Sequence, residues 1–353
     1  MISERGREHE SAPGRWTAKR ATDWYAQQPW LVGANFVPST ASNQLEMWQA
    51  TSFDPATIDR ELGWAASIGM NSMRVFLHDL LWLDDRIGLR DRIARYLDIA
   101  HRHRISTMLV LFDSVWNPNP KLGPQPDPQP GLHNSQWVQG PGVALADRSQ
   151  DARLQDYVED VVGAFASDER VIVWDVWNEP SNTNNGKFVE LPDKRELVAA
   201  LLPSVFAWAR NAKPSQPLTA GVWTGAKFSD DPLTSIQLDN SDVVSFHDYS
   251  PPSRLEERLA ELPSGRPILC TEFMARKAGS TFASALPILK RDKVAAYCWG
   301  LVAGRSQTIY PWDSWRAPYL NGPPDPWFHD VFHADGRPYR EDEVAVVREI
   351  TAR

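Results

Sequence analysis

Two glutamates, Glu179 and Glu272, each follow a short apolar run in the sequence. Residues 171–178 read Val-Ile-Val-Trp-Asp-Val-Trp-Asn before the first, and residues 267–271 read Pro-Ile-Leu-Cys-Thr before the second. Cleavage of a glycosidic bond needs two carboxyl groups in different protonation states, because one donates a proton to the leaving oxygen while the other attacks the anomeric carbon as an anion. If both runs are strands that end at one cavity, the two glutamates would supply the two carboxyl groups that this reaction needs.

Three more side chains at the ends of apolar runs could support the pair. Arg74 and Tyr249 could hydrogen-bond Glu272 and keep it ionised, and repulsion from that anion would raise the pKa of the other carboxyl group. Asn178 could bind the 2-hydroxyl of the sugar beside the cleaved bond. Arg74 has an alternative partner in Asp79, five residues further along.

The elements that would position these residues are eight short apolar runs that alternate with amphipathic stretches. This pattern is typical of repeated βα units around a parallel sheet whose strands are buried on both faces. The predicted fold class is α/β, a single (β/α)8 TIM barrel over residues 1–353, with residues 1–25 as an irregular N-terminal extension. Such barrels keep their sites at the C-terminal ends of the strands. We expect strands at 31–35, 72–77, 106–112, 171–177, 218–222, 243–247, 267–271 and 294–299, and a closing helix at 342–350.

Two aspartates near the strand ends could have structural or substrate-binding roles. Strict alternation along 171–177 turns Asp175 away from the cavity, which predicts a structural carboxylate between the barrel and its helices. Asp113, after the third strand, could bind sugar hydroxyls or could only cap its own loop.

A long segment at 116–142 is rich in proline and glycine, which excludes a helix or a central strand there. Strand and helix patterns resume after it with the same periodicity, so a long active-site loop after the third strand is favoured over a linker. The chain has 16 Trp, and the flat face and single N–H of a tryptophan suit a neutral sugar ring. We expect this loop to lie over the C-terminal mouth of the barrel and to present Trp116 or Trp137 to substrate.

The composition points away from several other classes of protein. A net charge of −8 without a Lys/Arg-rich run gives no footprint for nucleic acid or for a membrane surface. The N-terminus lacks the apolar core of a signal peptide, so a cytoplasmic protein is expected, or a secreted one if a signal was removed. Cys270 and Cys298 are expected to be free, buried thiols. No compact set of metal ligands and no glycine-rich phosphate loop is found, so no metal and no cofactor are predicted. The sequence carries no signal for the oligomeric state.

The Trp-Asn-Glu-Pro sequence at 177–180, with a glutamate ending the seventh strand, resembles glycoside hydrolase clan A, particularly its family 5-like enzymes of the cellulase and mannanase type. The positions of Arg74, of His247-Asp248-Tyr249 and of Trp299 follow the same pattern, and the resemblance runs from residue 31 to residue 315. One departure is the segment 112–116, where family 5 proteins usually have a substrate-binding histidine. The resemblance implies that Glu179 is the acid/base and Glu272 the nucleophile, and that the substrate contacts Arg74, Asn178, His247, Tyr249 and Trp299.

The activity implied is hydrolysis of a β-glycosidic bond by double displacement, with a β-mannoside or β-glucoside favoured. The partner would be an oligosaccharide or glycoside, and the long loop could close one end of the cleft into an exo-acting pocket. The alternative is a carbohydrate-binding or transglycosylating barrel of the same clan with little hydrolytic turnover.

Overall fold

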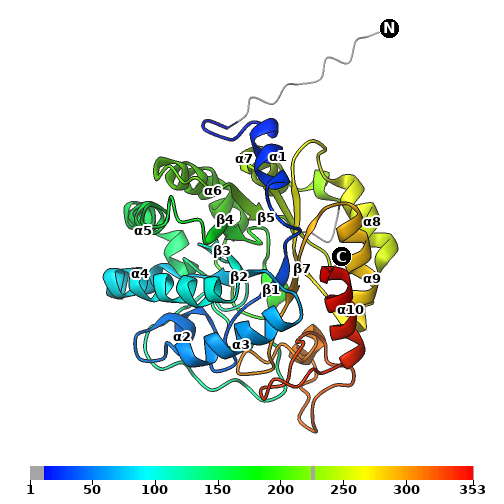
Figure 1. Cartoon of the computed structure of the whole chain (residues 1–353). Helices are drawn as coiled ribbons and strands as arrows, with labels where there is room; N and C mark the ends of the chain where they lie inside the picture. Colours follow the sequence, from blue (N-terminus) through cyan, green and yellow to red (C-terminus); the bar gives the residue numbers. More distant parts are fainter. Residues whose placement is uncertain (1–11, 224–226, 353) are drawn as a thin grey trace.

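Eight parallel strands form a nearly closed barrel in the computed structural model, which describes residues 12–223 and 227–352 (Figure 1). Their order is β5-β4-β3-β2-β1-β8-β7-β6, so strands that are consecutive in sequence are neighbours in the sheet. The two edges meet where Val222 bridges Phe246, and the Val222 amide donates to the carbonyl oxygen of Ser245 at 3.0 Å. The predicted (β/α)8 fold is confirmed. The strands are β1 (Val32–Asn35), β2 (Ser72–Phe76), β3 (Ser106–Val110), β4 (Val171–Asn178), β5 (Leu218–Gly221), β6 (Val244–His247), β7 (Ile268–Phe273) and β8 (Ala295–Trp299).

Each strand lies within two residues of its predicted ends, and the largest shifts are at the ends that carry the site. β7 continues to Phe273, so Glu272 is part of the strand and pairs with His247 of β6. β3 stops at Val110, two residues before its predicted end. Cys270 in β7 and Cys298 in β8 are buried free thiols, as predicted.

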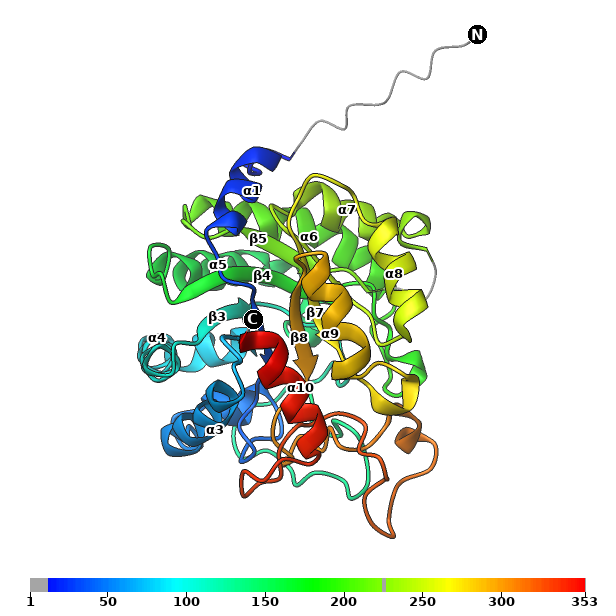
Figure 2. The ribbon, with the colours of Figure 1, turned by 45° about the vertical axis from the view of Figure 1, so that its right-hand side comes forward.

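The helices lie outside the sheet and cover its outer face (Figures 1 and 2). The start of α3, the longer of the two helices between β1 and β2, follows from its sequence. Asp54 accepts a hydrogen bond from the Thr57 amide at 3.0 Å, and Pro55 occupies the first helical position. No helix in the described part of the chain is long and apolar enough to cross a bilayer. The helices that follow strands are α2 (Gln44–Trp48), α3 (Pro55–Ser67), α4 (Asp79–Arg102), α5 (Asp151–Ala164), α6 (Lys194–Asn211), α7 (Pro232–Asn240), α8 (Pro252–Glu261), α9 (Phe282–Arg291) and α10 (Glu341–Ala352).

The prediction of an irregular segment over residues 1–25 is wrong for its last part. Residues Ala18–Ala26 form α1, and Thr17 caps it by accepting a hydrogen bond from the Arg20 amide at 3.1 Å. Trp16 is buried with residues at the N-terminal ends of the strands, and Figure 2 shows α1 at that end of the barrel. Ala21 is the one fully buried residue of the helix, and Trp24 and Tyr25, three and four residues further along, pack against the same cluster. The helix thus has a short apolar face, which was not recognised in the sequence.

Two long loops meet over the C-terminal mouth of the barrel. The loop after β3 closes on itself through bridges between Asp113 and Gly140 and between Asn117 and Val138, so it is a loop and not a linker. Its Asn134 amide donates to the carbonyl oxygen of Ser306 in the loop after β8, at 3.1 Å. The two loops together therefore build one side of the mouth, as predicted for the first of them.

Candidate active site

Glu179 and Glu272 line one pocket of about 730 Å³ at the mouth of the barrel. An oxygen of each carboxylate and a ring nitrogen of His247 all lie within 4.8 Å of one another. Each glutamate is only 5% exposed. This close spacing matches glycosidases in which a carboxylate attacks the sugar directly, because enzymes that place water between the carboxyl groups separate them by roughly 6.5 to 9.5 Å.

The carboxylate of Glu272 accepts hydrogen bonds from a cation and from a hydroxyl group. Nη1 of Arg74 donates to it at 3.0 Å, and the Tyr249 hydroxyl donates at 2.6 Å. Both contacts are those predicted from the sequence. The alternative partner for the arginine, Asp79, instead pairs with Arg153 at 2.8 Å.

Asp175 lies inside the barrel, so the prediction that it points toward the helices is wrong. Its Oδ2 accepts hydrogen bonds from Nε and Nη2 of Arg74 at 3.1 and 2.8 Å, and Nη2 also donates to Oδ1 of Asn178 at 2.7 Å. Residues three apart on a regular strand would face opposite sides. The register of β4 against β5 shifts between these two residues, because Asp175 pairs with Thr219 while Asn178 pairs with Gly221. This β-bulge turns both side chains toward the arginine.

Glu179 follows β4 in a left-handed backbone conformation, with φ at 45°, which is uncommon for a residue with a β-carbon and is often found at functional sites. Nδ2 of Asn182 donates to its Oε2 at 2.7 Å, and Nδ1 of His247 lies 2.7 Å from its Oε1. Burial lowers the pKa of His247 to about 4, so the imidazole is neutral near pH 7 and its Nδ1–H can donate to the glutamate.

The surroundings of the two glutamates favour different protonation states. Burial raises the pKa of Glu179 to about 7 and that of Glu272 to about 7. Carboxyl groups this close do not both ionise easily, so the pair loses its first proton where the charge is best stabilised. That position is Glu272, because the Arg74 guanidinium and the Tyr249 hydroxyl both donate to it. Near neutral pH the site can therefore hold one carboxylate anion beside one protonated carboxyl group.

Asp113 lies beneath the pocket and is 2% exposed. Its Oδ1 accepts hydrogen bonds from the Val115 amide and from Nδ2 of Asn178, both at 2.9 Å, and its Oδ2 accepts one from Nε1 of Trp137 at 2.7 Å. These contacts match the loop-capping alternative and place Asp113 behind Asn178. Burial raises its pKa to about 6.

A cluster of five aromatic side chains lies beside the pocket under the long loops, and two of them line it. Trp116 and Trp299 reach the pocket, whereas Trp137 lies behind them at 2% exposure, with its ring 5.6 Å from that of Trp299. Trp116 stacks on Trp315 of the loop after β8 at 5.2 Å, and Phe188 of the loop after β4 contacts Trp315 at 5.4 Å. We call these five residues the aromatic wall. Of the two tryptophans predicted for the loop after β3, Trp116 is the one exposed to the pocket.

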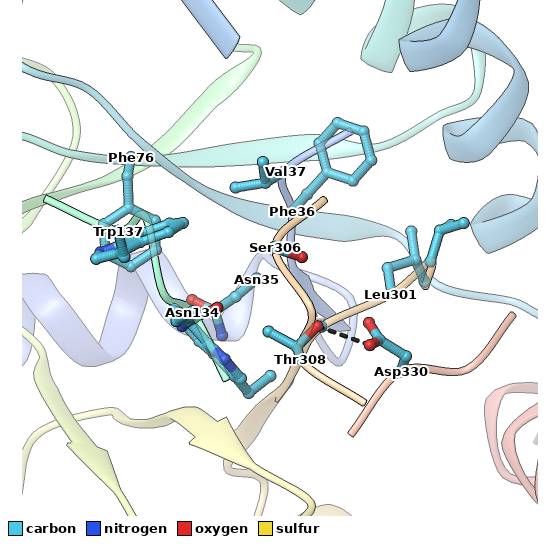
Figure 3. A pocket seen from close by; sticks show the side chains of 13 residues that line it. Asn35, Phe36, Val37, Phe76, Asn134, Trp137, Leu301, Ser306, Thr308 and Asp330 are labelled. Carbon is cyan, nitrogen blue, oxygen red and sulfur yellow. Dashed lines mark hydrogen bonds between the residues drawn. The ribbon is translucent and has the colours of Figure 1, made fainter. Parts of the chain in front are cut away.

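A second, small cavity of about 20 Å³ shares Asn134 and Trp299 with the main pocket. Figure 3 shows Asn134, Thr308 and Asp330 in its lining. Thr308 Oγ1 in its lining donates to Oδ2 of Asp330 at 2.7 Å. Among residues 12–223 and 227–352, Oδ1 of Asp330 and both side-chain polar atoms of Asn134 have no hydrogen-bond partner. Burial raises the pKa of Asp330 to about 7.

Replacing Asp330 with Asn should therefore change how stability depends on pH. The folded-state pKa of about 7 lies above the unfolded value of about 3.9, so the contribution of this aspartate is fully present below the unfolded value and is lost as pH rises through 7. We expect Asp330→Asn to gain stability relative to the wild type, by on the order of 2 kcal/mol, between pH 5 and pH 8.5. Urea unfolding at both pH values measures this. The same change at the exposed Asp84 is the control. If the difference in unfolding free energy between Asp330→Asn and the wild type is the same at pH 5 and pH 8.5, the prediction is wrong.

One group in the described part of the chain could hold a metal ion, formed by Glu179, His247 and Glu272. The sequence did not suggest it, because the three residues are far apart in the chain and come together only when the barrel closes. One oxygen of each glutamate already accepts a hydrogen bond from a protein donor, Asn182 or Tyr249.

The sequence-based prediction missed several residues of the pocket. Asn182 fixes Glu179, and His133 lines the wall from the loop after β3. Four cations also line the pocket, two from loops and two from helix α8, and no sequence motif identified them. They are Lys187, Arg254, Arg258 and Arg316.

Comparison with protein families gives one match, to the cellulase model of glycosyl hydrolase family 5, over residues 131–301. That range includes both glutamates and five of the eight strands in full. A search among curated proteins finds no match.

Several solved structures share the fold. An exo-β-1,4-mannosidase from Opitutaceae bacterium strain TAV5 is 19% identical, with a TM-score of 0.59 over 91% of this chain and 60% of that chain. GH5_18 from Streptomyces cattleya, solved in complex with GlcNAc, is 13% identical, with a TM-score of 0.59 over 92% and 80% of the two chains. A β-1,4-mannanase from the common sea hare Aplysia kurodai is 17% identical, with a TM-score of 0.54 over 76% and 87%.

Proposed function

We propose that the chain is a family 5-like glycoside hydrolase of clan A, whose cellulase model matches residues 131–301. In this proposal it cleaves a β-mannoside or β-glucoside with Glu272 as nucleophile and Glu179 as acid/base. The observation that carries the proposal is the asymmetry of the pair. Arg74 and Tyr249 both donate to Glu272, whereas the donors to Glu179 are neutral. One carboxyl group is thus suited to be an anion and the other to hold a proton, as double displacement requires.

In the first step, a carboxylate oxygen of Glu272 forms a bond to the anomeric carbon while the bond from that carbon to the leaving oxygen breaks. Glu179 transfers its proton to the leaving oxygen, so the aglycone departs as an alcohol. Asn178 lines the pocket in an orientation fixed by Arg74 and Asp113, and it is the residue we assign to the sugar 2-hydroxyl.

In the second step, Glu179 is ionised and acts as the base. It takes a proton from water, whose oxygen attacks the anomeric carbon as the ester bond to Glu272 breaks. The free sugar leaves with its original configuration, Glu179 is protonated again and Glu272 is again an anion. His247 and Asn182 hold the Glu179 carboxyl group in place through both steps.

The sugar is assigned by analogy, and β-mannosides are the first choice. The solved structures of similar fold include an exo-β-1,4-mannosidase and a β-1,4-mannanase. The loops after β3 and β8 meet over one side of the mouth, which suits a pocket that accepts the end of a chain. The proposed substrate is therefore a terminal β-mannosyl unit of an oligosaccharide, with a β-glucosyl unit as the second choice.

Product stereochemistry tests the mechanism. The enzyme is mixed with 4-nitrophenyl β-mannoside or β-glucoside, and proton NMR follows which anomer of the free sugar forms first. We expect the β-anomer first, with slow mutarotation to the α-anomer afterwards. An α-anomer formed first would reject Glu272 as a nucleophile. Tight sugar binding without turnover would instead favour the alternative of a carbohydrate-binding barrel of the same clan.

A further inference from the structure

The main pocket is lined by four cations and four acidic side chains, and outside the pair of glutamates the cations are in excess, although the chain as a whole has a net charge of −8. Apart from the two glutamates, its charged residues are the four cations Lys187, Arg254, Arg258 and Arg316 and the two carboxylates Asp248 and Asp313. A neutral sugar needs no such excess, because its hydroxyl groups are satisfied by neutral donors and acceptors.

The four cations differ in how their charges are compensated. Arg254 pairs with Glu257 at 2.7 Å, and Arg258 pairs with Glu261 at 3.0 Å. Lys187 and Arg316, in contrast, form no ion pair with any carboxylate in the described part of the chain. These two are the cations whose charge is available to a ligand.

The backbone places Lys187 and Arg316 at the same part of the rim. Lys187 precedes Phe188 and Arg316 follows Trp315, and the rings of Phe188 and Trp315 are in contact at 5.4 Å. Lys187 belongs to the loop that starts at Glu179, and Arg316 ends the short helix Trp312–Trp315 after β8. Two loops from distant parts of the sequence thus each bring a cation to one aromatic contact.

This aromatic contact belongs to the aromatic wall, whose pocket-lining members Trp116 and Trp299 can stack on a sugar. Trp315 stacks on Trp116, which lines the pocket together with Trp299. A sugar ring packed against this wall directs its substituents toward the rim, where the two cations stand. Arg316 also lines a neighbouring pocket of about 410 Å³ formed by residues 316–322 with Asp313. Its guanidinium is therefore positioned to contact a ligand that extends from the main pocket into this second one.

We propose that Lys187 and Arg316 select a sugar that carries a negatively charged substituent, either a carboxylate or a phosphate ester. Either group would lie between an ammonium and a guanidinium, and charge-assisted hydrogen bonds to both would add to the stacking of the ring. This inference rests on the proposed function, since it assumes that the pocket binds sugars.

Direct binding to the full chain tests the inference without requiring turnover. The probes form two matched pairs, 4-nitrophenyl β-mannoside with its 6-phosphate and 4-nitrophenyl β-glucoside with the corresponding β-glucuronide. Dissociation constants are measured by calorimetry over times too short for hydrolysis, at 20 and 500 mM salt. We expect the charged member of at least one pair to bind roughly 10-fold more tightly at low salt, with a smaller difference at high salt. The pair that shows the preference identifies phosphate or carboxylate as the recognised group.

Variants assign the effect to the two cations. Lys187→Met with Arg316→Met should remove most of the preference and leave the affinity for the neutral glycoside within about 2-fold, and Lys187→Glu should invert it. Lys121→Met, an exposed lysine that does not line the pocket, should behave as the wild type. Equal or weaker binding of both charged probes, with normal binding of the neutral ones, would overturn this inference alone. Failure of all four probes to bind would reject the proposed function together with it.

Discussion

Replacing Glu272 with Ala should lower kcat on every glycoside by at least about 10⁴-fold. The side chain supplies the atom that attacks the anomeric carbon, and Glu179, the other glutamate of the pocket, is held by Asn182 and His247. The loss should not depend on the leaving group, since the attack is missing whatever departs. Steady-state kinetics with aryl glycosides of different leaving-group pKa measure it.

Trapping of the intermediate gives an independent readout for the same residue. A 2-deoxy-2-fluoro glycoside with a good leaving group should inactivate the wild type and add one sugar to a peptide that contains Glu272. Glu169→Ala, at an exposed glutamate, controls for the substitution itself and should keep full activity. A label on any other residue, or a loss of less than about 100-fold in Glu272→Ala, would contradict the assignment.

Replacing Glu179 with Ala should give a different pattern, in which the loss depends on the leaving group. A dinitrophenyl group departs without protonation, so the first step should be nearly spared, whereas a natural disaccharide should lose about 10³-fold or more in kcat/KM. Water then lacks a base in the second step, and the glycosyl-enzyme should accumulate. Azide needs no base, so added azide should accelerate turnover and yield a β-glycosyl azide, which NMR identifies.

The backbone at Glu179 makes a second variant useful. Its φ of 45° favours glycine, so Glu179→Gly should fold at least as well as Glu179→Ala and show the same azide response. Equal losses on activated and natural substrates, without azide rescue in either variant, would show that another residue is the acid/base.

Much of the fold and the central pair were predictable, because both depend on patterns that are local in sequence. Eight buried strands appear as continuous apolar runs, and residues that follow such runs must meet at one mouth once the strands are parallel. The same reasoning from sequence places Arg74, Tyr249 and the two glutamates together at that mouth. It needs no information about loop conformation.

The errors arose where the backbone departs from regular geometry. The β-bulge in β4 turns the Asp175 side chain into the barrel, and the residue types in 171–178 do not predict this bulge. Helix α1 was missed because its apolar face is short, consisting of Ala21 with the partly buried Trp24 and Tyr25. The cations on the rim, such as Lys187, were missed because their position in the pocket depends on how two loops far apart in sequence pack against each other.

Arg74 also constrains how this sequence can change over generations. Its guanidinium is completely buried and donates to Asn35, Asp175, Asn178 and Glu272, which lie on three strands other than its own. Losing a carboxylate partner would leave part of a buried charge uncompensated, at a cost of roughly 3 to 5 kcal/mol, and Lys cannot reproduce the geometry of four simultaneous contacts. Substitutions at these five positions are therefore expected to be inherited as a set, so lineages descended from this chain should retain all five or replace several together.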